Sequence, residues 1–205
     1  GWRWNTSKAF LNADVRRRKN LAIWTQTQAC KLLLVGEAHG VTACRGLEVV
    51  REGQRVSLTA HKEVVLCAGA VGTPHLMQLS GLGPSALLAK FGIPVVKSME
   101  GVGQNLQDHL QIRAVFQVDG VSTLNTLANS WWGKARIALE YLFRRSGPMS
   151  MAPSQLGAFT RSDASQPHAN LEYHVQPLSL EAFGEPLHAF DAFTASVCNL
   201  NPTSR

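Results

Sequence analysis

The chain has 205 residues, 45% hydrophobic and 17% charged, a composition typical of a globular protein with one large or two small domains. Twenty basic and 14 acidic side chains give a net charge of +6, which mildly favours anionic ligands and is too diffuse to indicate nucleic-acid binding. No run of about 18 apolar residues occurs, so no transmembrane span is expected, and no signal peptide is evident.

The N-terminal segment is predicted to hold one short helical stretch and two strands. Residues 2–14 form the helical stretch, with Asn5 or Thr6 as its cap. Alternating apolar and polar residues predict a strand at 21–27, and a second strand follows at 31–36.

A hairpin and a buried strand are expected next. Two alternating segments, 46–50 and 55–60, flank Glu52-Gly53, which is a typical hairpin turn. Residues 63–68 are the most apolar strand and are expected to be covered on both faces, which would bury Cys67.

The sequence pattern changes after residue 109, and we place a domain boundary at 109–111. Residues 120–129 are expected to be a loop. Helices are predicted at 85–91 and 131–143, an extended piece at 93–96, and strands at 110–118, 157–160, 170–175 and 193–199.

The most informative segment is 69–83, which follows the apolar strand and reads Gly-Ala-Val-Gly-Thr-Pro-His-Leu-Met-Gln-Leu-Ser-Gly-Leu-Gly. A strand, a Gly-rich turn and a helix in that order are typical of a dinucleotide site. Thr73 can cap the helix, Pro74 suits its first position and Gly81 can end it.

This segment resembles the second signature of the glucose-methanol-choline (GMC) flavin oxidoreductases. A second segment at 101–109, Gly-Val-Gly-Gln-Asn-Leu-Gln-Asp-His, resembles another marker of that family. The resemblance extends from Arg3 to Arg205, and it is strongest to the bacterial choline and alcohol dehydrogenase branch, including the polyethylene-glycol type. The positions that fit the second signature are Gly69, Ala70, Thr73, Pro74, Leu76, Met77, Ser80, Gly81, Leu82 and Gly83.

The resemblance implies an α/β fold of mixed α+β type. Residues 1–109 would be part of an FAD-binding domain of the FAD/NAD(P)-binding type, and 110–205 part of a substrate domain with a mainly antiparallel sheet. It also implies that four residues contact the cofactor through their backbone or close to it in space. These are Ala68, Gly69 and Ala70 beside the adenosine or pyrophosphate of FAD, and Ala29, placed by the register of Asn20-Leu21, beside the adenine.

The implied reaction oxidises a primary alcohol, choline-like or other, to the aldehyde: a base takes the hydroxyl proton and the carbinol hydride passes to the flavin. Within the 205 residues no Gly-x-Gly-x-x-Gly opens a helix, and no counterpart of the family's catalytic His segment occurs. We therefore expect an internal fragment of such an enzyme, with no catalytic residue and no metal ligand of its own, that alone holds FAD weakly. Its electron acceptor stays open.

Two other functions compete with this interpretation. A catalytically dead, truncated binding or interaction module would use a sheet edge or the basic run at 16–19, which more often is a solvated loop. A nicotinamide-dependent dehydrogenase would need Gly-x-Gly-x-x-Gly and an acidic residue about 20 positions later, and the sequence has neither.

Several polar and aromatic groups are weaker candidates. Asp108 and His109 point to opposite faces of an extended chain, so a structural pair is favoured over acid–base chemistry. Gly101-x-Gly103 and Gly81-x-Gly83 are interpreted as turns. Four scattered cysteines support neither a disulfide framework nor a metal site and fit a cytoplasmic location.

The remaining histidines and one helix complete the candidates. The histidines lack metal-ligand spacing and are expected on the surface or satisfied in the core; they are His39, His61, His75, His168, His174 and His188. The 131–143 helix could lie in a membrane interface, which would give peripheral membrane association. An apolar stripe packed on a sheet is the favoured interpretation of the same pattern.

Overall fold

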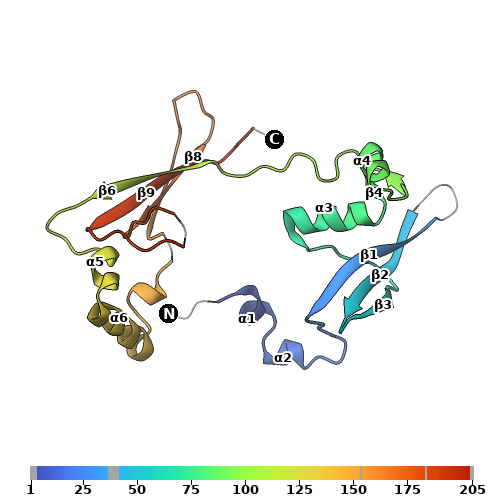
Figure 1. The fold of residues 1–205 in the computed structure, drawn as a ribbon, viewed down its shortest axis with the longest axis horizontal. Coiled ribbons are helices and arrows are strands. Elements are labelled where there is room, and N and C mark those ends of the chain that lie inside the picture. The colour runs from blue at the N-terminus through green and yellow to red at the C-terminus, as the bar shows by residue number, and fades with distance from the viewer. Residues whose placement is uncertain (1–3, 37–41, 153, 183, 204–205) are drawn as a thin grey trace. The chain divides into compact units, whose positions relative to one another are not determined.

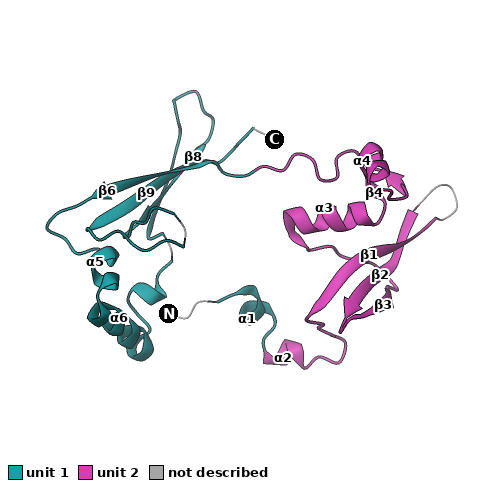
Figure 2. Cartoon of the chain, viewed as in Figure 1, with its two compact units in different colours: residues 1–12, 108–204 teal, residues 13–107, 205 magenta. Residues whose placement is uncertain are grey.

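The computed structural model describes residues 4–36, 42–152, 154–182 and 184–203 (Figure 1). These fall into two compact units (Figure 2): unit 1 comprises 1–12 and 108–204, and unit 2 comprises 13–107 with residue 205. His39 lies outside the described residues.

Two short helices replace the single helical stretch predicted near the N-terminus. Helix α1 (Thr6–Phe10) begins where the Asn5 side chain accepts a hydrogen bond from the Lys8 N–H at 2.8 Å, so the predicted Asn5 cap is confirmed. Helix α2 (Ala13–Arg16) is followed by Arg17, which pairs with Asp14 on the surface. The basic run is therefore solvated, as favoured from the sequence.

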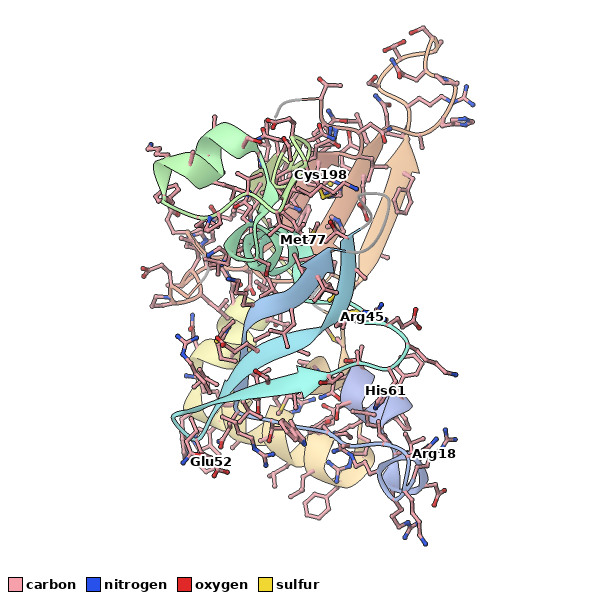
Figure 3. The ribbon with its side chains drawn as sticks, turned by 90° about the vertical axis from the view of Figure 1, so that its right-hand side faces the viewer. Arg18, Arg45, Glu52, His61, Met77 and Cys198 are labelled. Carbon is pink, nitrogen blue, oxygen red and sulfur yellow. The ribbon has the colours of Figure 1, made fainter. Side chains whose placement is uncertain are left out.

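Unit 2 is built on a three-stranded antiparallel sheet in the order β1 (Thr27–Gly36), β2 (Thr42–Arg51), β3 (Gln54–Thr59). The hairpin turn is confirmed: Glu52 and Gly53 have φ of 51° and 77°, and Glu52 marks the tip in Figure 3.

The two strands predicted at 21–27 and 31–36 are one strand, β1. It begins only at Thr27, whose partner is Arg51 at the end of β2. Gln26, just before it, has a φ of 52°, which breaks the extended conformation. Residues 21–25 have the alternating apolar and polar sequence of a strand, but they are not assigned to one. The reason is that no residue of β2 pairs with their backbone.

The predicted buried strand at 63–68 is wrong for this chain. The segment has no strand assignment, Val65 is 71% exposed and Cys67 is exposed too. A strand needs backbone partners, and no described strand pairs with these residues. Only Val64 and Leu66 turn inward, into a small apolar cavity that Leu32 and Met77 also line.

Helix α3 (Gly69–Leu79) follows and packs on β1. The connection is a buried hydroxyl: Ser80 Oγ accepts a hydrogen bond from the Leu32 N–H at 2.8 Å and donates one to the Leu76 carbonyl at 2.6 Å. Next come β4 (Leu82–Gly83), α4 (Ser85–Lys90) and β5 (Lys97–Ser98), with β4 and β5 parallel. The α4 prediction is confirmed, and the extended piece lies slightly later than predicted.

Unit 1 contains a four-stranded antiparallel sheet in the order β6-β9-β8-β7. Figure 1 labels its strands β6, β9 and β8. The predicted strands are confirmed within one or two residues, and with them the mixed α+β fold with a mainly antiparallel sheet. Their bounds are β6 (Gln111–Gln117), β7 (Leu156–Thr160), β8 (Leu171–Gln176) and β9 (Ala192–Asn199).

Besides α1, the helices described in unit 1 are α5 (Leu124–Asn129), α6 (Trp131–Arg144) and the short 3₁₀ helix η2 (Pro148–Ser150). The loop predicted at 120–129 is confirmed for 120–123 and wrong for 124–129, which form α5; Thr123 caps this helix, and its hydroxyl in turn donates to Asp191. In the described parts of the chain, no helix has the length and apolarity needed to cross a membrane.

Candidate functional site

The N-terminal end of α3 carries the residues predicted to contact a cofactor. Ala68 is the N-cap, and Gly69 and Ala70 are the first two helical residues. Gly69 has a φ of 83°, which disfavours any side chain, and a Cβ built there would meet nothing within 4 Å. The space beside Gly69 is therefore open to a ligand.

Thr73 does not cap the helix as predicted from the sequence. The helix starts four residues earlier, and the Thr73 hydroxyl accepts a hydrogen bond from the Ala68 N–H at 3.1 Å. Pro74 accordingly lies inside the helix. It removes a backbone donor within the first two turns, close to the end where donors lack helical partners.

The two sequence motifs meet at one cavity. Gln78 on α3 donates a hydrogen bond from Nε2 to the Val102 carbonyl at 3.1 Å, which brings the 101–109 segment against the helix. Gly103 fits there because an added Cβ would lie 2.6 Å from Gln78 Nε2. The cavity between them measures about 660 Å³ and is lined by Ala70, Val71, Pro74, His75, Gln78 and residues 103–107.

This arrangement fits an anionic nucleotide. The first backbone N–H groups of an α-helix have no carbonyl within the helix to which they can donate. The positive end of the helix dipole lies at the same place. Because Gly69 leaves this end uncovered and Ala70 lines the cavity, a pyrophosphate can approach the backbone closely. No side chain of acid–base type is needed for that contact.

Ala29 lies apart from the cavity lining. Ala29 lies in β1 and pairs with Val49 of β2, next to an irregularity in register between Ala29 and Lys31. Leu32, three residues later, is bonded to Ser80 at the far end of α3. Ala29 thus belongs to the strand that α3 covers, but it is not among the residues that line the 660 Å³ cavity.

The weaker candidates behave as expected from the sequence. The Asp108 carboxylate accepts a hydrogen bond from the backbone N–H of His109 at 2.8 Å, which is a local turn contact. Gly103 lies in a turn with a φ of 82°, and Gly81 with a φ of 86° packs against the Pro94 carbonyl. Neither glycine pair opens a long helix.

One cluster of possible metal ligands was not predicted from the sequence. Glu172 and His174 on β8 and Cys198 on β9 place their ligand atoms within 4.8 Å of one another. Glu172 and Cys198 are 26 residues apart, and they become neighbours because they are register partners in the sheet. Burial and the nearby Glu172 raise the pKa of the Cys198 thiol. Only knowledge of the strand register could have predicted this group.

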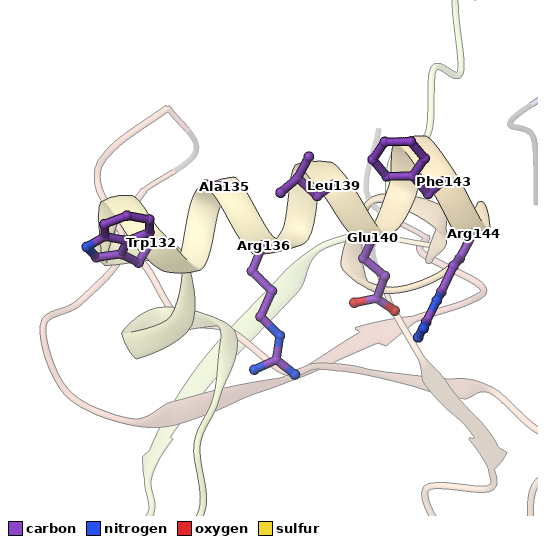
Figure 4. Close-up of a pocket in the computed structure, with 7 residues that line it drawn as sticks. All are labelled: Trp132, Ala135, Arg136, Leu139, Glu140, Phe143 and Arg144. Carbon is purple, nitrogen blue, oxygen red and sulfur yellow. The ribbon is translucent and has the colours of Figure 1, made fainter.

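A second surface lies on α6, where the residues around one open hollow all come from this helix (Figure 4). Trp132 and Phe143 on this helix are 81% and 78% exposed, so among the residues that the structure describes the apolar stripe does not pack on a sheet, contrary to the favoured prediction. Arg136, Glu140 and Arg144 line the same hollow, so its charged side chains are two cations and one acid.

Comparison with known proteins gives one family match. A family model described as GMC oxidoreductase matches residues 1–111. The chain is 34% identical over its whole length to the oxygen-dependent choline dehydrogenases of Burkholderia ambifaria and Burkholderia cenocepacia. It spans 35% of the length of those curated relatives.

Solved structures show the same fold. A formate oxidase matches with a TM-score of 0.77 and 23% identity, over 93% of this chain and 37% of that one. Pyridoxine 4-oxidase from Mesorbium loti matches with a TM-score of 0.73 and 26% identity, over 97% of this chain and 34% of that one. A fungal aryl-alcohol oxidase matches with a TM-score of 0.61 and 28% identity, over 72% of this chain and 25% of that one.

Proposed function

The chain belongs to the GMC oxidoreductase family, and from this we propose that it forms part of an FAD-dependent enzyme that oxidises a primary alcohol, choline-like or other. The observation that carries the proposal is the meeting of two family motifs at one cavity, through Gln78 and Val102. The choline dehydrogenases to which the chain is similar support an alcohol as the substrate class.

In this proposal the chain's own residues hold and orient the cofactor. Gly69 and Ala70 would offer backbone N–H groups to the pyrophosphate of FAD, with Ala68 beside it and Ala29 near the adenine. When bound, the flavin supplies the redox chemistry by accepting a hydride from the alcohol. Residues 1–109 would then be part of the FAD-binding domain, and 110–205 part of the substrate domain.

The cofactor contact can be tested on the 205-residue chain by following backbone amide signals in NMR titrations. FAD and ADP, which both carry a pyrophosphate, should shift the Gly69 and Ala70 amides. Riboflavin, which lacks it, should not. Shifts confined to other parts of the chain would argue against the site.

A pair of matched variants sharpens that test. Gly69 and Gly92 both have positive φ, 83° and 66°, with nothing within 4 Å of an added Cβ. Alanine should therefore cost each of them a similar backbone strain of about 1–2 kcal/mol. We expect Gly69→Ala to weaken ADP binding at least tenfold and Gly92→Ala to leave it unchanged; equal affinities would refute the role of Gly69.

The activity is tested by reading the coding DNA on both sides of this segment. An in-frame Gly-x-Gly-x-x-Gly upstream and a His-containing segment downstream would support the alcohol-oxidising enzyme. Expression of that longer product should then give flavin reduction by an alcohol. Stop codons or unrelated sequence close to both ends would instead favour the truncated binding module.

The exposed face of α6 supports a second role, peripheral binding to an anionic lipid surface. Trp131, Trp132 and Phe143 are each at least 78% exposed, and Lys134, Arg136 and Arg144 on the same helix outnumber its single acid, Glu140. Aromatic residues next to cations suit the interface of a membrane that carries negative headgroups. The free cysteines among the described residues suit a cytoplasmic location for the protein.

Lipid binding can be measured by sedimentation with vesicles. The chain should sediment with vesicles that contain phosphatidylglycerol and much less with pure phosphatidylcholine. A Trp132→Ser/Phe143→Ser double variant should lose the binding, whereas Phe91→Ser, at a residue 66% exposed in unit 2, should keep it. Equal sedimentation of both variants would contradict the assignment to α6.

A further inference from the structure

The sheet of unit 1 carries a polar face on which three metal-binding side chains converge. Cys198 on β9 (Figure 3) lies directly opposite Glu172 on β8, and His174 follows Glu172 by two residues. Side chains alternate along a strand, so all three project from the same face of the sheet. Cys198 is buried, whereas the side chains of Glu172 and His174 are 19% and 32% exposed.

From this geometry we propose that Glu172, His174 and Cys198 bind a zinc ion. The donor atoms are already close to the required spacing: His174 Nε2 lies 3.2 Å from Glu172 Oε1, and Cys198 Sγ lies 3.8 Å from Glu172 Oε2. Zinc bonds of about 2.3 Å to sulfur and about 2.0–2.1 Å to nitrogen and oxygen give tetrahedral edges of about 3.3–3.6 Å. The sulfur and the imidazole nitrogen, within 4.8 Å, need only a modest approach.

The ligand types favour zinc over the hard cations. Thiolate and imidazole suit Zn²⁺, whereas Mg²⁺ and Ca²⁺ prefer sites made of oxygen ligands. The charges also balance, because one thiolate and one carboxylate neutralise the two charges of the ion and the imidazole is neutral. Binding releases the thiol proton of Cys198 to solvent, and a water molecule completes the fourth position.

The surroundings allow an ion to enter. Glu172 and His174 form the partly exposed side of the cluster, and Cys198 lies beneath them. Arg113 on β6 is a cation on the same face; it lies opposite Ser196 and donates a hydrogen bond to Gln176 Oε1 at 3.2 Å. Its guanidinium therefore reaches across β9 to the end of β8, four residues beyond Glu172.

The proposal is tested by titrating the metal-free 205-residue chain with Zn²⁺ in competition with a chromophoric chelator. We expect one zinc ion per chain, and Co²⁺ should give the absorption band of a thiolate–cobalt bond. Cys198→Ser and His174→Asn should each weaken binding at least tenfold. Cys67→Ser and His168→Asn, which alter exposed residues, serve as matched controls.

Two outcomes would overturn the zinc site: absence of the cobalt–thiolate band in the unaltered chain, or equal zinc affinity in all variants. In either case the cluster would be only a His–Glu pair with a thiol donating to the same carboxylate. Circular dichroism of each variant without metal checks its folding. If Cys198→Ser unfolds, the near-isosteric Glu172→Gln decides the question, with the same tenfold loss expected.

Discussion

The hydroxyl of Ser80 links the end of the candidate cofactor helix to strand β1 of the sheet through a buried hydrogen bond. Ser80 is 1% exposed, and its Oγ lies 2.8 Å from the backbone nitrogen of Leu32, which is itself 5% exposed. Ser80→Ala removes that acceptor and leaves the Leu32 N–H buried without a partner. A buried donor that loses its partner costs about 1–3 kcal/mol, so we expect a loss of about 2 kcal/mol.

The loss is measured by urea unfolding together with hydrogen exchange of the Leu32 amide. A change of about 2 kcal/mol corresponds to roughly 30-fold faster exchange when opening limits protection. Ser57→Ala, at an exposed position on β3, should change the free energy of unfolding by less than about 0.5 kcal/mol.

The role of Ser80 is refuted if Ser80→Ala unfolds at the same urea concentration as the unaltered chain and the Leu32 amide keeps its protection. That result would mean that β1 and α3 are held together by side-chain packing alone. Faster exchange at Leu32 without global destabilisation would place the effect in local opening, which still agrees with the bond seen in the structure.

Two further predictions concern the polar contacts that support α5. Asn125 is fully buried and forms hydrogen bonds with the Ser179 N–H, the Ser179 hydroxyl and the Phe190 carbonyl. Asn125→Ala should therefore lower the free energy of unfolding in urea by about 3 kcal/mol or more. A loss under about 1 kcal/mol would contradict this expectation. Hydrogen bonds from the Thr123 N–H, the Thr126 hydroxyl and the Thr123 hydroxyl lower the pKa of Asp191. A lowered folded-state pKa gives stability that is present above the unfolded value of about 3.9 and is lost as pH falls through the folded value. Asp191→Asn should therefore flatten the fall in stability below about pH 4, measured by thermal unfolding across pH; an unchanged slope would refute the role of Asp191.

Local sequence signals predicted the structure correctly where residues close in the chain determine the backbone conformation. Glu52-Gly53 predicted the hairpin correctly because Gly53 freely adopts the positive φ that such a turn needs; Glu52 also has a positive φ, which a non-glycine residue seldom adopts. Asn5 predicted the start of α1 for the same local reason, a side chain that accepts from a nearby N–H. The sequence pattern likewise predicted the strands β6 to β9, whereas their antiparallel arrangement was implied only by the family resemblance.

Predictions failed where the deciding partner lies far away in the chain. Thr123 caps α5, but what holds Thr123 is Asp191, 68 residues later, so the segment 120–129 looked like a loop. The apolar segment 63–68 has the composition of a strand, yet strand formation depends on a neighbouring backbone, and no described strand supplies one. The exposed Val65 shows the consequence directly.

The same distinction separates the two candidate sites of the molecule. The cavity at α3 could be anticipated because each motif is contiguous in sequence, and the fold adds one contact, from Gln78 to Val102, that brings them together. The cluster of Glu172, His174 and Cys198 could not, because its ligands acquire their spacing from strand register and not from sequence separation. A one-residue slip between β8 and β9 would send Cys198 to the opposite face of the sheet and abolish the cluster. The register that Ser196 helps to fix, through its hydroxyl bond to the His174 carbonyl, is therefore what makes a metal site conceivable on this face.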